Sequence, residues 1–187
     1  MFGHTAAMTA ANDPMPCVRP LQHSDLQGLM EIQRACYGAA YAESESVFAR
    51  RLAHPLHCSL ALECDGALLG YLAAYWSKAG KVTPLHGDFE PCAAPAVLYL
   101  HDLAVHPAHA GQGLARRLLA PLWAQARERG IHVSCLVSVQ GTQDYWRRHG
   151  YRPQALPDPK QRLRLTSYGE DALFMQRTDS GDNAGYA

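Results

Sequence analysis

This sequence of 187 residues has little that would direct it out of the cell or onto a charged partner. No apolar run approaches the roughly 18–20 residues that span a bilayer, and the opening MFGHTAAMTAANDPMP lacks the basic and apolar regions of a signal peptide. Seventeen Lys and Arg residues balance 17 Asp and Glu residues, so net charge favours neither nucleic acid nor an anionic membrane as a partner. We therefore expect a cytoplasmic protein that binds neither.

The sequence also lacks the spacings that mark metal sites and disulfide frameworks. Its six cysteines are scattered singly, without a CxxC pair. His101, His106 and His109 lie close together, but no Asp, Glu or Cys completes a recognisable ligand set around them. We expect no bound metal, and free thiols that pack as small apolar side chains.

Length and composition indicate one domain with a sizeable core. The chain is 48% hydrophobic, and domains commonly hold roughly 100–200 residues. Both ends are rich in small and polar residues, so 1–15 and 177–187 are expected to be disordered tails. That leaves a single domain over residues 16–176.

Hydrophobic periodicity and turn residues predict alternating strands and helices. Asp65-Gly66 separates two apolar runs and predicts a hairpin, whereas 77–96 has no periodicity and is expected to be a functional loop. In chain order we predict a strand at 17–21, helices at 26–37 and 44–52, strands at 57–63, 67–76 and 97–105, a helix at 113–129, a strand at 131–139, a helix at 142–149, and strands at 163–165 and 172–175. This order places one parallel βαβ unit inside an otherwise antiparallel sheet.

The run VLYLHDLAV at 97–105 is apolar almost throughout, as expected for a central strand that is buried on both faces. Side chains alternate along a strand, which predicts His101, Leu103 and Val105 on one face and Asp102 on the other. A carboxylate in such a strand needs a partner or a shifted pKa. Asp102 is either a group that orients the site or a structural ion on the opposite face, and we favour the second interpretation.

The turn PAHAGQG at 107–113 joins this strand to the next helix. A helix N-terminus presents free N–H groups that bind phosphate oxygens, and Gly111 and Gly113 allow the backbone to approach them closely. A P-loop would need a Lys-Ser/Thr pair, which this turn lacks, and a dinucleotide-binding turn would need a third glycine where Arg116 stands. A third type of phosphate-binding turn, which needs neither feature, binds the pyrophosphate of coenzyme A.

Two motifs resemble those of the GNAT N-acetyltransferase superfamily. There, a hydrophobic strand ends in V-x-P and is followed by [R/Q]-x-x-G-x-[G/A] at a helix start, matched here by Val105-His106-Pro107 and by AGQGLA at 110–115. The second motif is a helix that closes on Gly-[Phe/Tyr], matched by YWRRHGY at 145–151. The strand segment YLHDLAVH at 99–106 is similar to the arylalkylamine N-acetyltransferase branch, which carries HLHxLAVH there.

The resemblance covers residues from about 17 to 175. It implies an α/β (α+β) fold of the GNAT type, with a mixed, mostly antiparallel sheet of six or seven strands. Helices are expected on both faces of this sheet, and the central parallel pair of strands is expected to splay apart. Dimers are common in this superfamily, so a homodimer is one of the states that the resemblance allows.

The resemblance further implies acetyl-CoA as the cosubstrate. The backbone of the central strand would bind pantetheine and the turn would bind the pyrophosphate. Ala110 stands where the family usually has Arg or Gln, and Trp146 stands where many members place the tyrosine that protonates the departing thiolate. The residues expected to bind the cofactor are Leu103, Ala104, Val105, Ala110, Gly111, Gln112, Gly113, Leu114, Ala115, Arg116 and Trp146.

Family chemistry is direct attack of an amine on the acetyl thioester. An alkyl amine of pKa near 10.4 is deprotonated only about once in 2,500 molecules at pH 7, which is worth roughly 4.6 kcal/mol. A base with a pKa near neutrality offsets part of this cost, and the resemblance places His101 in that role. The alternative for His101 is a core histidine bonded to a neighbour. Tyr145 is the candidate proton donor.

The acceptor is expected to be a primary amine, either a small molecule or a peptide. The first two helices and the 77–96 loop carry carboxylates and aromatic rings that suit a cationic amine, among them Glu43. The candidate acceptor-binding residues are Tyr37, Tyr41, Trp76, Asp88, Glu90 and Tyr99. The alternative function is a non-catalytic acyl-CoA-binding sensor on the same fold, which the Trp146 and Ala110 departures leave open.

Overall fold

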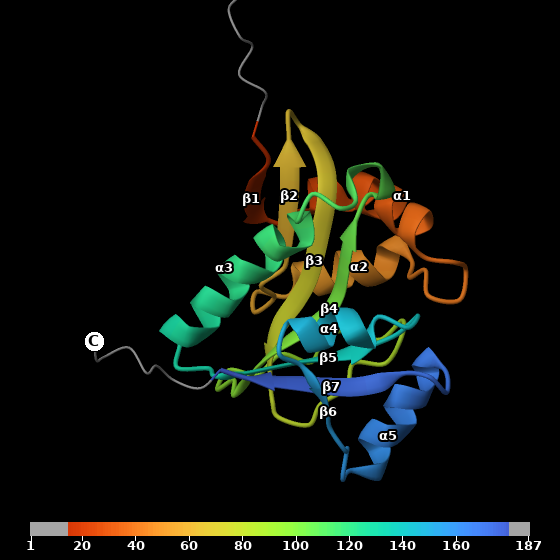
Figure 1. Ribbon diagram of the computed structural model, residues 1–187, viewed down its shortest axis with the longest axis vertical. Coiled ribbons are helices and arrows are strands. Elements are labelled where there is room, and N and C mark those ends of the chain that lie inside the picture. Colours follow the sequence, from red (N-terminus) through yellow and green to blue (C-terminus); the bar gives the residue numbers. More distant parts are fainter. Residues whose placement is uncertain (1–14, 180–187) are drawn as a thin grey trace, which may run out of the picture.

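The computed structural model describes residues 15–179, which form a seven-stranded sheet in the order β1-β2-β3-β4-β5-β7-β6 (Figure 1). All neighbouring strands are antiparallel except β4 and β5. The elements are β1 Cys17–Pro20, η1 His23–Asp25, α1 Leu26–Cys36, α2 Glu45–Ala53, β2 Leu60–Cys64, β3 Ala67–Ser77, β4 Val97–Val105, η2 Pro107–His109, α3 Leu114–Glu128, β5 Val133–Ser138, α4 Gln143–Arg148, β6 Arg152–Pro153, α5 Pro159–Leu165, η3 Thr166–Tyr168 and β7 Leu173–Thr178. The expected mixed, mostly antiparallel fold is confirmed.

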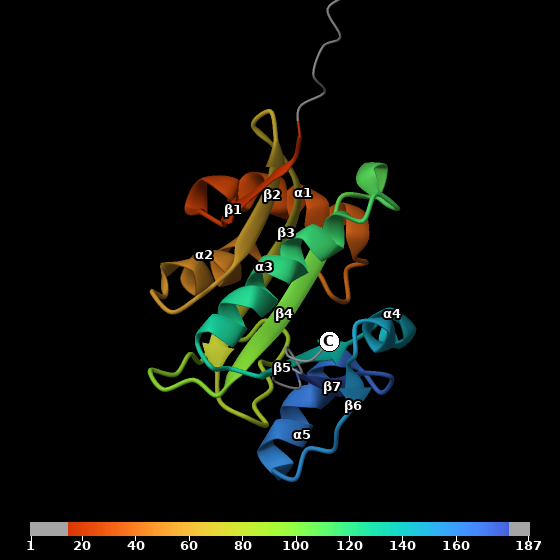
Figure 2. The ribbon, with the colours of Figure 1, turned by 60° about the vertical axis from the view of Figure 1, so that its left-hand side comes forward.

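Helices cover both faces of the sheet, as the amphipathic patterns predict (Figure 2). Helices α1 and α2 pack on one face around Leu29, Ile32 and Phe48. Helix α3 packs on the other face through Leu118 and Leu122, and α4 joins it there. Within residues 15–179, no helix combines the length and the apolar character needed to cross a membrane.

The hairpin between β2 and β3 is confirmed. Asp65 and Gly66 both adopt positive φ angles, 51° and 78°, as a two-residue turn of type I′ requires. This hairpin brings β3 next to β4, the long central strand that carries the candidate site.

The predicted strand at 163–165 is wrong, because these residues end helix α5. The side chain of Asp158 accepts a hydrogen bond from the Lys160 amide and caps this helix, and Pro159 occupies its first turn. The short strand β6 was not predicted. Strand β7 continues to Thr178, so the C-terminal tail cannot begin at residue 177. The rest of both expected tails, 1–14 and 180–187, lies outside the described residues.

Strand β4 contains a bulge that changes which side chains share a face. Ala73 of β3 pairs with Asp102 and Ala74 pairs with Leu100, so His101 is the extra residue. Beyond it the alternation is reversed: Ala104 packs with the α1 side of the core, while Leu103 and Val105 pack with the α3 side. The expectation that Asp102 lies on the face opposite His101 is therefore wrong.

Strands β4 and β5 diverge after a short parallel pairing, which confirms the predicted splay. Only three residue pairs join them, from Leu98–Ser134 to Leu100–Leu136. In Figure 1, β4 runs steeply while β5 and β7 run across it. The wedge between the two strands opens beside His101 and is where the candidate site lies.

Candidate active site

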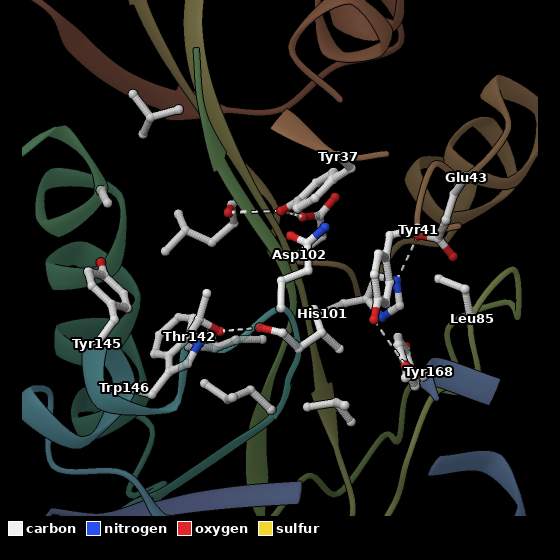
Figure 3. A pocket seen from close by; sticks show the side chains of 18 residues that line it. Tyr37, Tyr41, Glu43, Leu85, His101, Asp102, Thr142, Tyr145, Trp146 and Tyr168 are labelled. Atoms are coloured by element: carbon white, nitrogen blue, oxygen red, sulfur yellow. Dashed lines mark hydrogen bonds and ion pairs between the residues drawn. The ribbon is translucent and has the colours of Figure 1, made fainter. Parts of the chain in front are cut away.

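A cavity of about 260 Å³ fills the wedge between β4 and β5. Its floor is formed by residues 100–103 of β4 and by Leu136 and Val137 of β5, and α4 forms one wall (Figure 3). The opposite wall comes from the segment between α1 and α2, the 78–96 loop and η3. The predicted site residues that line the cavity are Tyr37, Tyr41, His101, Leu103, Val105, Ala115, Tyr145 and Trp146.

His101 reaches the cavity because the bulge turns its side chain toward the α1–α2 segment. The side chain is only 2% exposed, and its ring lies between those of Phe89 and Tyr99, at centroid distances of 5.5 and 6.4 Å. Nε2 lies 2.8 Å from Oε2 of Glu43. Nδ1 is buried and has no hydrogen-bond partner among the residues that the structure describes. The ring is therefore fixed at one nitrogen and unsatisfied at the other.

Glu43 is the partner of His101, and it is itself buried at 3% side-chain exposure. Its carboxylate accepts hydrogen bonds from both terminal nitrogens of Arg51, at 2.6 and 2.7 Å, and from the His86 amide at 2.7 Å. Burial alone would raise the pKa of Glu43. The facing His101 ring and the hydrogen bonds from Arg51 outweigh burial and hold that pKa well below its usual range. Glu43 is therefore an ionised acceptor.

Asp102 is the second carboxyl group at the cavity. The hydroxyls of Tyr37 and Tyr71 donate to its two oxygens, each at 2.5 Å. Burial raises the pKa of Asp102, while these two hydrogen bonds oppose the rise. Burial also raises the pKa of each tyrosine, so both hydroxyls stay protonated as donors. Asp102 thus orients Tyr37 at the cavity wall and is not a solvated ion.

The edge of β4 that faces the wedge turns two backbone amides toward the space that β5 has left. The His106 amide donates to the Leu69 carbonyl of β3 at 2.8 Å, so alternation turns the amides of Val105 and Leu103 toward the edge that β5 has left. The Tyr37 hydroxyl lies 3.1 Å from the Leu103 carbonyl on this edge. Ala104, which was also predicted to bind the cofactor, is buried on the α1 side and does not line the cavity.

Helix α4 contributes two adjacent aromatic rings to the cavity. Tyr145 and Trp146 meet edge-to-face with centroids 5.1 Å apart. Trp146 is 9% exposed and also packs against Tyr151. Both side chains line the cavity. Burial raises the pKa of Tyr145, so its hydroxyl is protonated near neutral pH.

The glycine turn opens helix α3 as predicted. Gly113 is the N-cap, and Gly111 and Gly113 have φ angles of 78° and 71°. A Cβ added at either glycine would meet no heavy atom of the described chain within 4 Å. The space over the helix N-terminus is therefore open and suits a phosphate group. Ala110 and Gln112 are exposed beside this space, and Leu114 is buried beneath the helix.

Arg116 points away from the cavity. It lines a wider polar pocket on the outer side of α3, together with Arg148 of α4 and Arg177 of β7. Three elements therefore contribute arginines to this outer pocket, and Asp179 pairs with one of them, Arg177, at 2.6 Å. Within the described residues, no three His, Cys, Asp or Glu side chains come together as metal ligands.

Two aromatic residues predicted to bind the acceptor lie elsewhere. Trp76 is 4% exposed on the α3 face of the sheet, with the guanidinium of Arg129 at 4.6 Å from its ring centroid. Tyr99 is fully buried, and its hydroxyl accepts the Thr83 amide at 3.2 Å. Both prefer the core because a strand within a covered sheet buries its rings on either face.

The two loop carboxylates predicted to bind the acceptor are also outside the cavity. Asp88 is exposed and pairs with Arg50 at 2.9 Å. Glu90 pairs with Arg164 at 2.6 Å and also with Lys81. Each carboxylate faces a cation on the outer surface, so neither contributes to the cavity.

The roles of Glu43 and Tyr168 were missed. The sequence places Glu43 among the carboxylates that suit a cationic amine, whereas in the structure it is the buried partner of His101. Tyr168 lines the cavity, and its carbonyl accepts the Tyr41 hydroxyl at 3.3 Å. In the sequence, Glu43 lies in a run of polar residues before helix α2. Such a run does not tell whether an acid in it is buried or solvated.

Residues 26–151 match the model of the acetyltransferase (GNAT) family. The chain is 27% identical over 175 residues to the N-alpha-acetyltransferase RimI of Mycobacterium tuberculosis, covering 94% of this chain and 99% of that protein. The ribosomal-protein-S18-alanine N-acetyltransferase of Escherichia coli has a similar structure, with 19% identity, a TM-score of 0.65 and coverage of 92% and 100%. A GNAT family acetyltransferase of Brucella melitensis, solved with acetyl-CoA, has 22% identity, a TM-score of 0.55 and coverage of 90% of each chain.

Proposed function

This chain belongs to the GNAT acetyltransferase family, and from that premise we propose that it transfers an acetyl group from acetyl-CoA to a primary amine, with His101 as the base. The observation that carries the proposal is the unsatisfied Nδ1 of a cavity-lining histidine whose Nε2 is bound to an ionised glutamate. A buried nitrogen without a partner is costly in a merely structural role. It is the atom required of a general base.

The acceptor amine must lose a proton before it can attack. Because Glu43 accepts from Nε2, the neutral ring carries its hydrogen there and leaves the Nδ1 lone pair free. His101 takes the ammonium proton at Nδ1. The resulting imidazolium is stabilised by the Glu43 carboxylate at 2.8 Å. General bases of this kind contribute roughly 10²–10⁴-fold to rate.

The wedge and the glycine turn fit acetyl-CoA. When bound, acetyl-CoA supplies a thioester whose carbonyl carbon accepts the amine nitrogen as the C–S bond breaks and the CoA thiolate departs. Gly111 and Gly113 would hold the pyrophosphate over the N-terminus of α3, where the backbone leaves open space. The amides of Leu103 and Val105 would bind pantetheine at the edge that β5 has left.

The departing thiolate requires stabilisation at the α4 side of the cavity. Tyr145 is protonated there and donates a hydrogen bond. Complete proton transfer from its hydroxyl to a thiolate of pKa near 8.5 is uphill, because an ordinary tyrosine already has a pKa of about 10. The Trp146 indole N–H is likewise only a donor. The proposed role of Tyr145 is therefore hydrogen bonding to sulfur, and the second proton, which leaves the nitrogen as the amide forms, reaches the thiolate through water.

The acceptor would lie between His101 and the aromatic wall formed by Tyr37 and Tyr41. Both cavity carboxylates already have partners, Glu43 in Arg51 and His101, and Asp102 in two tyrosines. Recognition of the amine would then rest on the ring faces and on His101.

The test is an assay of thiol release from acetyl-CoA with a panel of primary amines and N-terminal peptides, with mass spectrometry of the acceptor. The proposal expects thiol release that depends on an acceptor, and an acceptor that gains one acetyl group. Calorimetry with acetyl-CoA runs alongside. Tight binding without acetylation of any acceptor would overturn the proposal in favour of a non-catalytic acyl-CoA-binding protein.

A further inference from the structure

We propose that Glu43 is a positioning residue, which holds His101 in the tautomer that leaves Nδ1 free. Arg51 weakens the electrostatic attraction between Glu43 and the protonated His101 ring. The inference rests on the proposed function and assigns roles in it to two buried side chains, Glu43 and Arg51. Glu43 comes from the segment between α1 and α2 and His101 from the bulge of β4 (Figure 3), whereas Arg51 comes from helix α2.

The contacts define the hydrogen position. Oε2 of Glu43 lies 2.6 Å from a guanidinium nitrogen of Arg51 and 2.8 Å from Nε2 of His101. An ionised carboxylate only accepts hydrogen bonds, so Nε2 must carry the hydrogen. The opposite tautomer would leave two acceptor atoms facing each other at 2.8 Å in a buried site. Glu43 therefore excludes that tautomer.

Arg51 shares the same carboxylate oxygen and opposes the attraction between Glu43 and a protonated His101. Its side chain is 1% exposed. It has further partners in the Gly87 carbonyl, at 2.6 and 3.1 Å, and in the faces of the Phe48 and Phe89 rings. These contacts hold the guanidinium independently of Glu43. One carboxylate thus lies between two cationic groups, one permanent and one that appears during catalysis.

The other titratable groups near the His101 ring do not alter the charges of the His101, Glu43 and Arg51 group. Burial raises the pKa of Tyr99 and of Tyr168, so both stay neutral. Asp102, the next residue on β4, interacts with the His101 charge but is hydrogen-bonded by two tyrosines. The charged or titratable groups facing His101 are therefore Glu43, Arg51, Asp102, Tyr99 and Tyr168.

Two substitutions separate positioning from a structural role. Glu43→Gln keeps an acceptor for Nε2 but removes the negative charge, so the acid limb of the kcat/KM profile should move down by about one pH unit or more. Arg51→Met keeps the side-chain length but removes the opposing cation, so the same limb should move up. Opposite displacements support the proposal. Loss of stability with no displacement, or displacement in one direction in both variants, would overturn it.

Nitrogen-15 NMR of the histidine rings supplies a readout that needs neither activity nor a variant. In the wild-type protein at high pH, His101 should carry its proton on Nε2, and a proton on Nδ1 would overturn the proposal even if a single variant does not fold. Titration of this ring should follow the displacements of the kcat/KM profile. If no acceptor is acetylated, the proposed function fails, while the NMR readout still tests the tautomer that Glu43 holds. If acetylation occurs and His101→Gln retains it, His101 is not the base and the positioning role of Glu43 fails with it.

Discussion

Gly113, the N-cap of helix α3, is the position where one side chain tests the phosphate cradle most simply. Its φ angle is 71° and an added Cβ meets no heavy atom of the described residues within 4 Å. Gly113→Glu and Gly113→Gln should therefore both fold, each with about 1–2 kcal/mol less stability because L-residues are strained in this conformation. The two side chains have the same length, and only glutamate adds charge.

The expected difference follows from the charge. Two unit charges about 4 Å apart repel by about 1 kcal/mol in water and about 4 kcal/mol at an effective dielectric constant of 20. For a pyrophosphate with two negative charges, even the aqueous value gives roughly 2 kcal/mol. Gly113→Glu should then bind CoA at least about 30-fold more weakly than Gly113→Gln.

Isothermal titration calorimetry with CoA measures this difference, with circular dichroism as the control for folding. The gap between the variants should narrow at high salt, because the Debye length is about 10 Å at 0.1 M and about 3 Å at 1 M. Equal dissociation constants for the two variants at low salt would refute the placement of the pyrophosphate at this turn.

Tyr145→Phe should lower kcat roughly tenfold with little change in KM, since it removes one hydrogen bond of about 1.5 kcal/mol to a developing charge; steady-state thiol release measures this, and an unchanged kcat would contradict it. Tyr71→Phe should destabilise the fold by about 1–3 kcal/mol where Asp102 is ionised and by less where it is protonated. The Tyr71 hydrogen bond favours the ionised carboxylate and opposes the rise of the Asp102 pKa, so its loss raises the folded-state pKa further and the destabilisation grows as pH rises through that pKa; urea unfolding that gives the same loss at every pH would contradict this prediction. The double variant Asp88→Asn with Glu90→Gln should leave KM for a cationic amine unchanged at low salt. A severalfold rise in KM would show that these loop carboxylates take part in acceptor binding.

Local sequence signals predicted the elements that local physics determines. The Asp65-Gly66 hairpin and the glycine turn before α3 each depend on residues within one short segment. Helix α5 belongs to the same class: Asp158-Pro159 is an N-cap signal, and its neglect in favour of the apolar Leu163 and Leu165 gave a false strand.

The face of the central strand could not be predicted from alternation alone. A single bulge residue, His101, reverses every later side chain, and nothing in the apolar run marks where the bulge falls. The consequence is large, since the bulge brings Asp102 to the α1 side with His101 and turns Leu103 and Val105 toward the α3 side of the core.

The partner of His101 was out of reach for a different reason. Glu43 lies 58 positions earlier in the chain, in an irregular segment between two helices. Whether such an acid is solvated or buried depends on where Arg51 and His101 lie in space, and no local pattern encodes that distance. By the same argument, Asp88 and Glu90 looked like acceptor-binding acids but pair with surface cations.

The role of His101 as the base is tested by comparing wild type with His101→Gln in acetyl-CoA thiol release across pH 6 to 9 with one primary amine. Glutamine retains a donor for Glu43 and removes the free base. We predict a deficit of roughly 10²–10⁴-fold near pH 7 that shrinks as pH approaches the amine pKa of about 10, because the acceptor then deprotonates without help. A deficit below about threefold near pH 7, or one that does not change with pH, would contradict the assignment of His101 as the base.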